Sequence, residues 1–131
     1  MKLIYLPALI LLFLLPGFAP ADPIDDVASL LKQGNTKELA KLFAPSIEIS
    51  LMDDENIYSQ AQATLILDKF FSRNKPKSIK LLHKVNSSAN YRFGVFILNT
   101  DNGLYRVAFT LKGSDEKMNI IELRIENEKV K

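Results

Sequence analysis

Cysteine and tryptophan are absent from this chain of 131 residues, and His83 is its single histidine. Without cysteine, the fold has no disulfide bond, no thiolate metal site and no cysteine nucleophile. Acidic and basic side chains nearly balance, at a formal net charge of +2, so the composition favours neither a nucleic acid nor an anionic membrane as partner. These absences leave a domain that its apolar core must stabilise.

The first 21 residues have the pattern of an export signal. Lys2 is the only charged residue before Asp22, an apolar run covers residues 3–15, and residues 19–21 match the A-x-A cleavage pattern. The run is shorter than the about 20 apolar residues that cross a bilayer, although an uncleaved N-terminal anchor is the alternative. We expect a signal peptide over residues 1–21, and export to a periplasm or to the exterior. An exported domain without disulfides is typical of bacteria.

Residues 22–131 read as one domain with the element order ααββαββββ and no further membrane span. Asp22-Pro23 and Asn35 are start signals for two short helices, the second with Phe43 in its apolar stripe and Pro45 as its end. A strand over 47–51 and a turn over 53–56 precede a third helix, which begins at Ser59. Strands are expected over 78–86, 90–100, 104–112 and 117–126. Helices first and an antiparallel meander last indicate an α+β fold.

Hairpin chemistry predicts which strand residues share a face. Asn102-Gly103 is a favoured two-residue turn and pairs Phe96 with Phe109. Apolar matching then places Ile121 opposite Phe109. The predicted helix-facing apolar set is Ile79, Leu81, Val85, Phe96, Leu98, Val107, Phe109, Leu111, Ile121, Leu123 and Ile125.

The third helix carries the residues that suggest a family. The step from "NIYS" into "QAQATLILDKFF" resembles the strand-to-helix segment, ending in paired aromatics, of the nuclear transport factor 2-like superfamily. That family often has a glycine where this chain has Ser59 or Gln60. More narrowly, the chain resembles the bacterial secreted family named domain of unknown function 4783. The resemblance implies a cone-like curved antiparallel sheet wrapped around three helices, and it implies no particular activity.

The candidate pocket lies on the concave face of that sheet. A four-residue loop around Ser87-Ser88 would place His83 opposite Gly94, whose missing side chain leaves room. An imidazole there has a reference pKa near neutrality and is the one weak catalytic candidate, while a rim position is the alternative. The predicted pocket-lining residues are His83, Gly94, Phe96, Phe109 and Phe70.

Other charged groups read as solvated surface. The acidic turn residues Asp53 to Glu55 lack the alternating spacing of a calcium loop. The lysines at 75, 77, 80 and 84 lack interleaved aromatics. Asp68 falls one residue from the apolar stripe and should face solvent. We therefore expect no metal, no cofactor and no nucleic acid.

Phe93, Val95 and Ile97 fall on the face away from the helices, so their strand is apolar on both sides. A contiguous apolar patch on a sheet often marks an interface, although scattered exposed apolar residues are ordinary. We expect a homodimer through this convex face.

Three functional hypotheses remain open. The first is a non-enzymatic module that binds a small apolar ligand or a protein partner. The alternatives are a small enzyme with isomerase- or dehydratase-like acid–base chemistry in the cone, and a structural interaction module with a plugged core.

The export signal yields a testable prediction. N-terminal sequencing of the exported protein should read Asp-Pro-Ile, beginning at Asp22, because the A-x-A pattern ends at Ala21. Recovery of intact Met1 in a membrane fraction would support the uncleaved anchor instead.

Overall fold

The computed structural model describes residues 22–86, 88, 90–114 and 117–128, so the predicted signal peptide lies outside the described residues. The elements are α2 (Pro23–Gln33), α3 (Thr36–Leu42), β1 (Phe43–Leu51), β2 (Asp54–Ser59), α4 (Gln60–Arg73), β3 (Pro76–Val85), β4 (Tyr91–Thr100), β5 (Gly103–Ser114) and β6 (Lys117–Asn127). The predicted element order and the α+β class are confirmed.

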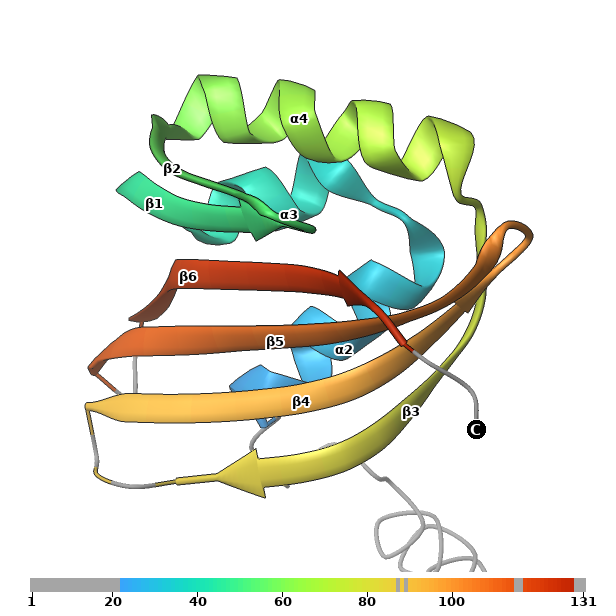
Figure 1. The fold of residues 1–131 in the computed structure, drawn as a ribbon. Helices are drawn as coiled ribbons and strands as arrows, with labels where there is room; N and C mark the ends of the chain where they lie inside the picture. Colours follow the sequence, from blue (N-terminus) through green and yellow to red (C-terminus); the bar gives the residue numbers. More distant parts are fainter. Residues whose placement is uncertain (1–21, 87, 89, 115–116, 129–131) are drawn as a thin grey trace, which may run out of the picture.

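All six strands form one sheet, in the order β2-β1-β6-β5-β4-β3. Neighbouring strands are antiparallel except β1 and β6, which run parallel. Figure 1 shows the sheet curving, with α2 against its inner side behind β4 and β5, and with α3 and α4 at the β1 end. The helix-covered side is called the concave face below, and the opposite side the convex face.

The start of α4 is the one predicted from its capping residues, whereas the end of α3 differs from the prediction. The capping box that begins α4 is confirmed: the Ser59 N–H donates to Gln62 Oε1 at 3.0 Å, and the Gln62 N–H donates to Ser59 Oγ at 3.2 Å. Phe43, expected in the second helix, instead begins β1. The cause is Pro45, whose ring disfavours helical backbone at the preceding Ala44.

The β4–β5 hairpin has the predicted faces but a different register. Phe96 pairs with Val107, not with Phe109. Only Gly103 takes a positive φ in this turn, at 123°, whereas the expected turn requires positive φ at Asn102 as well. The register differs by two residues, and an even shift leaves every side chain on its predicted face.

A β-bulge on β6 corrects one core prediction. Thr110 pairs with Glu122, but the next residue, Leu111, pairs with Ile120. Ile121 is therefore the extra residue of the bulge. Ile120 takes the buried position predicted for Ile121. A bulge of one residue reverses the faces on one side of it.

A second β-bulge, on β3, places His83 on the other face of the sheet from the one predicted. Leu81 pairs with Phe96 as predicted, but the register shifts before His83, which pairs with Val95. Lys84, and not His83, is the partner of Gly94. The predicted placement of His83 on the concave face is therefore wrong.

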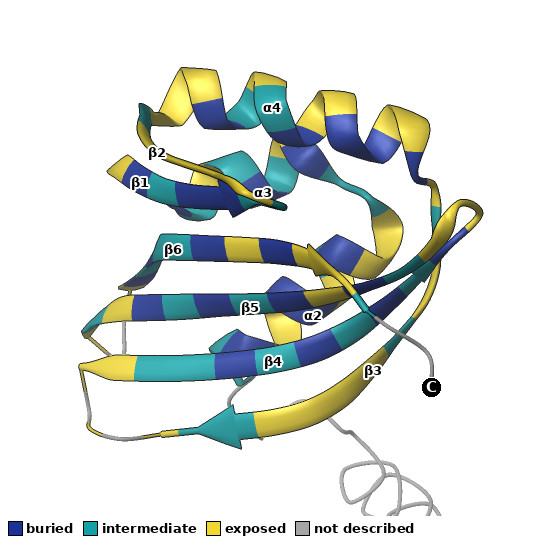
Figure 2. Cartoon of the chain, in the orientation of Figure 1, coloured by how far each residue is buried: buried dark blue, intermediate teal, exposed yellow. Residues whose placement is uncertain are grey.

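Most of the predicted core is confirmed. Buried positions from that set are Phe96, Leu98, Val107, Phe109, Leu111, Leu123 and Ile125. The prediction that Leu81 is buried is wrong: β3 is an edge strand of the sheet, and Leu81 is 47% exposed. The prediction that Val85 is buried on the concave face is also wrong, because Val85 lies beside Phe93 on the convex face. Figure 2 shows the alternation of buried and exposed residues along β5 and β6 and the exposed length of β3.

Candidate functional site at the open end of the sheet

The space beside Gly94 is filled by helix α2. A Cβ built on Gly94 would lie 2.9 Å from Cγ2 of Ile24, which is fully buried. The rings of Phe96 and Phe109 stack nearby, with centroids 5.7 Å apart. Three of the predicted pocket-lining residues therefore belong to packed core.

His83 is not brought together with those residues. It is exposed, and it pairs with Val95 on the convex face. Asp68, the acidic residue beside the α4 stripe, is exposed as expected.

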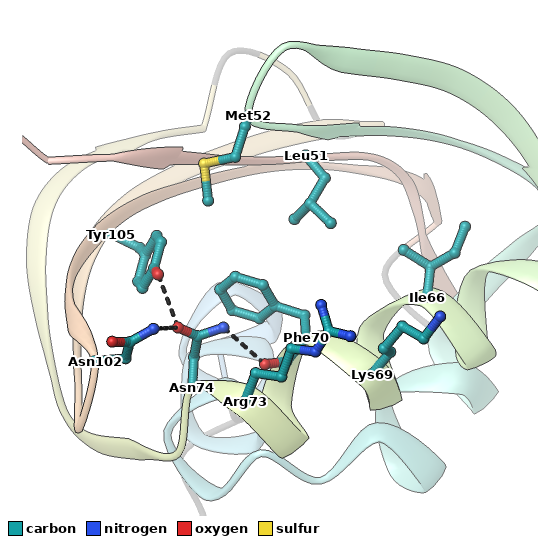
Figure 3. A pocket seen from close by; sticks show the side chains of 9 residues that line it. All are labelled: Leu51, Met52, Ile66, Lys69, Phe70, Arg73, Asn74, Asn102 and Tyr105. Carbon is teal, nitrogen blue, oxygen red and sulfur yellow. Dashed lines mark hydrogen bonds between the residues drawn. The ribbon is translucent and has the colours of Figure 1, made fainter.

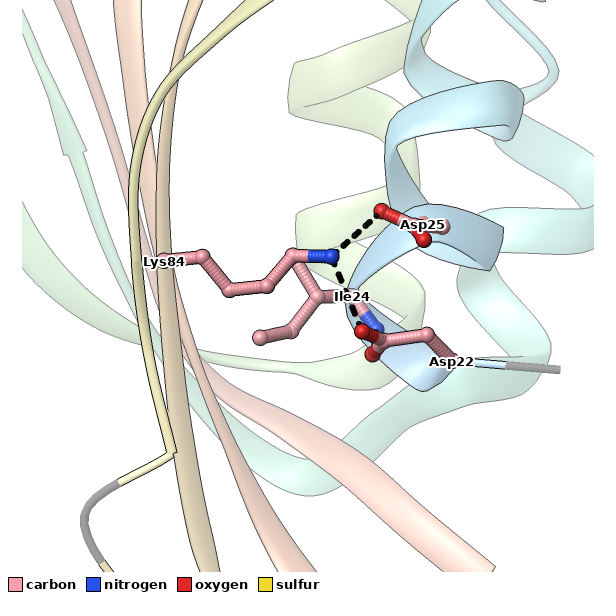
Figure 4. A network of polar contacts seen from close by, with 4 residues as sticks. All are labelled: Asp22, Ile24, Asp25 and Lys84. Carbon is pink, nitrogen blue, oxygen red and sulfur yellow. Dashed lines mark hydrogen bonds and ion pairs between the residues drawn. The ribbon is translucent and has the colours of Figure 1, made fainter. Parts of the chain in front are cut away.

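Lys84 occupies the concave side of β3 and connects it to α2 (Figure 4). Its Nζ lies 2.9 Å from Asp22 Oδ2 and 2.9 Å from Asp25 Oδ1. Asp22 also caps α2, because its Oδ1 accepts from the N–H of Ile24 at 2.9 Å. Burial raises the pKa of Asp22, but hydrogen bonds from Lys84 and from the Ile24 N–H outweigh it, so the pKa falls below 3.8. Hydrogen bonds to Asp22 and Asp25 raise the pKa of Lys84 above 10.5.

The opposite end of the concave face holds a cavity of about 280 Å³ (Figure 3). Its lining residues are Leu51, Met52, Ile66, Lys69, Phe70, Arg73, Asn74, Asn102 and Tyr105. Phe70 is the one predicted pocket residue among them. Helix α4 contributes one stripe at the spacing i, i+3, i+4 and i+7, which places these four side chains on one helix face.

A hydrogen-bonded amide forms the polar part of the cavity wall. The side-chain nitrogen of Asn74 donates to the Phe70 carbonyl at 2.9 Å. The side-chain oxygen of Asn74 accepts from the Tyr105 hydroxyl at 2.7 Å and from the Asn102 amide at 3.1 Å. The Tyr105 ring meets Phe70 edge-on, with centroids 5.1 Å apart. This network ties the end of α4 to β5 and to the β4–β5 hairpin.

Sequence reasoning missed most of this cavity, although two signals pointed to it. The alternation along β5 that predicts a buried Val107 extends back to Tyr105, which is 7% exposed. The stripe through Ile66 and Phe70 extends to Lys69 and Arg73 at helical spacing. Asn74 and the β1 end had no comparable signal, because their roles depend on contacts between distant segments.

The predicted convex patch is half-buried. Phe93, Val95 and Ile97 lie on the face away from the helices, with Ala108 beside Val95 and Thr110 beside Phe93. No helix of the described residues packs against this face in Figure 1. Whether a second chain covers it stays a prediction.

Metal and membrane signals are absent from the described residues. No three His, Asp or Glu side chains within them are placed to hold a metal ion. Within the same part of the chain, no helix has the length and hydropathy of a bilayer span.

The model of one protein family matches residues 24–126, nearly all of the described chain. That family is described as a domain of unknown function, DUF4783. The chain belongs to the DUF4783 family. The resemblance drawn from the third helix is confirmed. A comparison with curated proteins finds no match.

Solved structures support the fold of this DUF4783 chain. A DUF4783 family protein from Bacteroides uniformis is 24% identical, with a TM-score of 0.77 over 83% of this chain and 100% of its own. One from Bacteroides ovatus is 22% identical, with a TM-score of 0.75 over 85% and 98%. A domain with a cystatin-like fold from Nostoc punctiforme is 8% identical, with a TM-score of 0.61 over 79% and 72%. At these identities the likeness shows the fold alone.

The Lys84 network yields a prediction for this DUF4783 chain. Lys84→Met should lower the free energy of unfolding by about 1 kcal/mol at neutral pH, since the pairs are partly exposed and screened. The Asp22 contribution is present above pH 3.8 and is lost as pH falls through its lowered pKa. The Lys84 contribution is present below pH 10.5 and is lost as pH rises through its raised pKa. Urea unfolding across pH measures this.

Lys80→Met on the same strand is the matched control, because it removes the same charge at an exposed site. A Lys84→Met effect that stays constant into strong acid would show that the aliphatic stem of Lys84 acts, not its charge.

Proposed function

We propose that this protein is a non-enzymatic, exported ligand-binding module, and that the cavity at the open end of the sheet is its binding site. The observation that carries the proposal is the lining: a mostly apolar wall with one hydrogen-bonded polar cluster. Concave, mostly apolar sites with few polar groups are typical of small-molecule binding.

The chemistry of the lining favours binding over catalysis. Its titratable side chains are Lys69, Arg73 and Tyr105, and the Tyr105 hydroxyl is committed to Asn74. General acid–base catalysis works best with a group whose pKa lies near the operating pH, and the lining has neither carboxylate nor imidazole. The cavity volume of about 280 Å³ also argues against a fully plugged structural module.

Export of the protein is compatible with the described fold. Asp22 caps α2 through the Ile24 N–H, so cleavage after Ala21 would leave every described element intact. A periplasmic or extracellular module would meet its ligand outside the cytoplasm.

Ligand binding is tested by nuclear magnetic resonance titration with octanol and octanoate. We expect a Kd of about 1 mM, since about 10 non-hydrogen atoms at about 0.4 kcal/mol each give about 4 kcal/mol. Shifts should concentrate on amides of Leu51, Ile66 and Tyr105. Ile66→Trp, which fills the cavity, should abolish them.

Leu65→Trp is the matched control, because Leu65 is adjacent in sequence but 71% exposed. The proposal fails if neither probe shifts the cavity amides of the wild type, or if Ile66→Trp responds like the wild type.

We also propose a homodimer through the convex patch of Phe93, Val95 and Ile97. Small Ala108 beside Val95 lets a second sheet approach closely. Because the three side chains are already half-buried, burying them in both partners would remove at most a few hundred Å² of apolar surface, worth several kcal/mol at about 25 cal/mol per Å². Association costs of comparable size oppose this, so the expected affinity is micromolar.

Sedimentation velocity across a concentration series tests the dimer. Val95→Glu should give a folded monomer at every concentration, because it would bury a charge at the patch centre. Leu65→Glu, on the exposed side of α4, should leave the dimer unchanged. A wild type that is monomeric at high concentration contradicts the proposal.

A further inference from the structure

We infer that the cavity takes a small organic anion with an apolar body, such as a medium-chain carboxylate. The inference rests on the proposed binding function and names the chemical class of the ligand. It depends on two cationic side chains at the cavity, Lys69 and Arg73.

These two residues differ from the cations that carboxylates compensate. Ion pairs with carboxylates involve Lys41, Lys84, Arg106 and Arg124. Lys69 and Arg73 have no such pair among the described residues, and no residue of the lining is acidic. Four residues apart on one helix, their charges repel each other. A bound anion would relieve that repulsion.

The position of the charges gives the ligand a direction. Lys69 and Arg73 are exposed, whereas Phe70, between them in sequence, is 6% exposed. Figure 3 shows Lys69 and Arg73 on the α4 side of the cavity, with Leu51 and Met52 across from that helix. An apolar body would lie against Leu51 and Phe70, and the anionic group would remain near the cations, partly in water.

The polar wall is compatible with this orientation. The Asn74 side-chain oxygen already accepts two hydrogen bonds, from Tyr105 and Asn102, so it does not demand a donor from the ligand. The volume of about 280 Å³ equals that of roughly nine water molecules at about 30 Å³ each. A ligand of about ten non-hydrogen atoms suits that space.

The end of a helix offers a simpler account of Arg73 alone. A cation in the last turn interacts favourably with the helix dipole. That account does not extend to Lys69, one turn earlier, and it predicts no preference of the cavity for anions. Selectivity among ligands of equal chain length therefore separates the two explanations.

The experiment compares octanoate, octanol and octyltrimethylammonium by titration, read from the cavity amides. Two exposed cations should make octanoate bind about tenfold tighter than octanol, and the ammonium probe weaker than octanol. Raising the salt concentration should shrink the difference. Lys69→Met with Arg73→Met keeps apolar side chains in place. It should bring octanoate to within about twofold of octanol.

Lys32→Met with Lys37→Met is the control, since it removes the same charge from exposed positions that do not line the cavity. Retention of the tenfold preference in this control supports the inference. Equal binding of octanoate and octanol by the wild type overturns the inference and leaves the binding function standing. An unchanged preference in the Lys69/Arg73 double variant also overturns it. Binding of neither probe overturns both proposals.

Discussion

The contact of Ile24 with the backbone of Gly94 is the constraint on which the rest of this structure depends. A side chain at Gly94 would require Ile24 to move, since even a Cβ would lie 2.9 Å from it. With glycine there, α2 rests directly on β4 and can lie inside the curve of the sheet. Close approach of this kind requires a residue without a side chain. Phe109, which also faces this contact, is fully buried.

The position of α2 divides the concave face into two ends with different properties. At one end, Ile24 and the stacked rings of Phe96 and Phe109 complete a packed core. At the other end, α4 contributes Ile66, Lys69, Phe70 and Arg73 to the cavity lining. Asn74 holds that end in place by hydrogen bonds, in addition to the edge-on packing of Tyr105 on Phe70. A wall held by directional bonds can stay fixed while the space beside it remains unfilled.

The two ends also differ in whether acidic side chains compensate the charge of a lysine. Lys84 is partly buried beside α2, where two carboxylates compensate its charge and a capping interaction orders one of them. Lys69 lies at the cavity, where no lining residue is acidic. Water solvates an exposed ammonium group well, so an unpaired Lys69 costs the fold little. The same charge becomes more effective toward a ligand that displaces part of that water.

The sequence by itself determined the element order, the helix starts and the faces of β4 and β5. Those features depend on local spacing: the Ser59 capping box lies within four residues, and an even register shift keeps Phe96 and Val107 on the predicted face. Tertiary structure alone decided the bulges at Ile121 and before His83, because one extra residue is tolerated only where the packing above it allows. Tertiary structure also decided which residues line the cavity. The cavity joins Leu51, Ile66 and Tyr105, which are far apart in the chain. No periodic pattern encodes such a meeting, because it depends on the curvature of the sheet and on where α2 fills it.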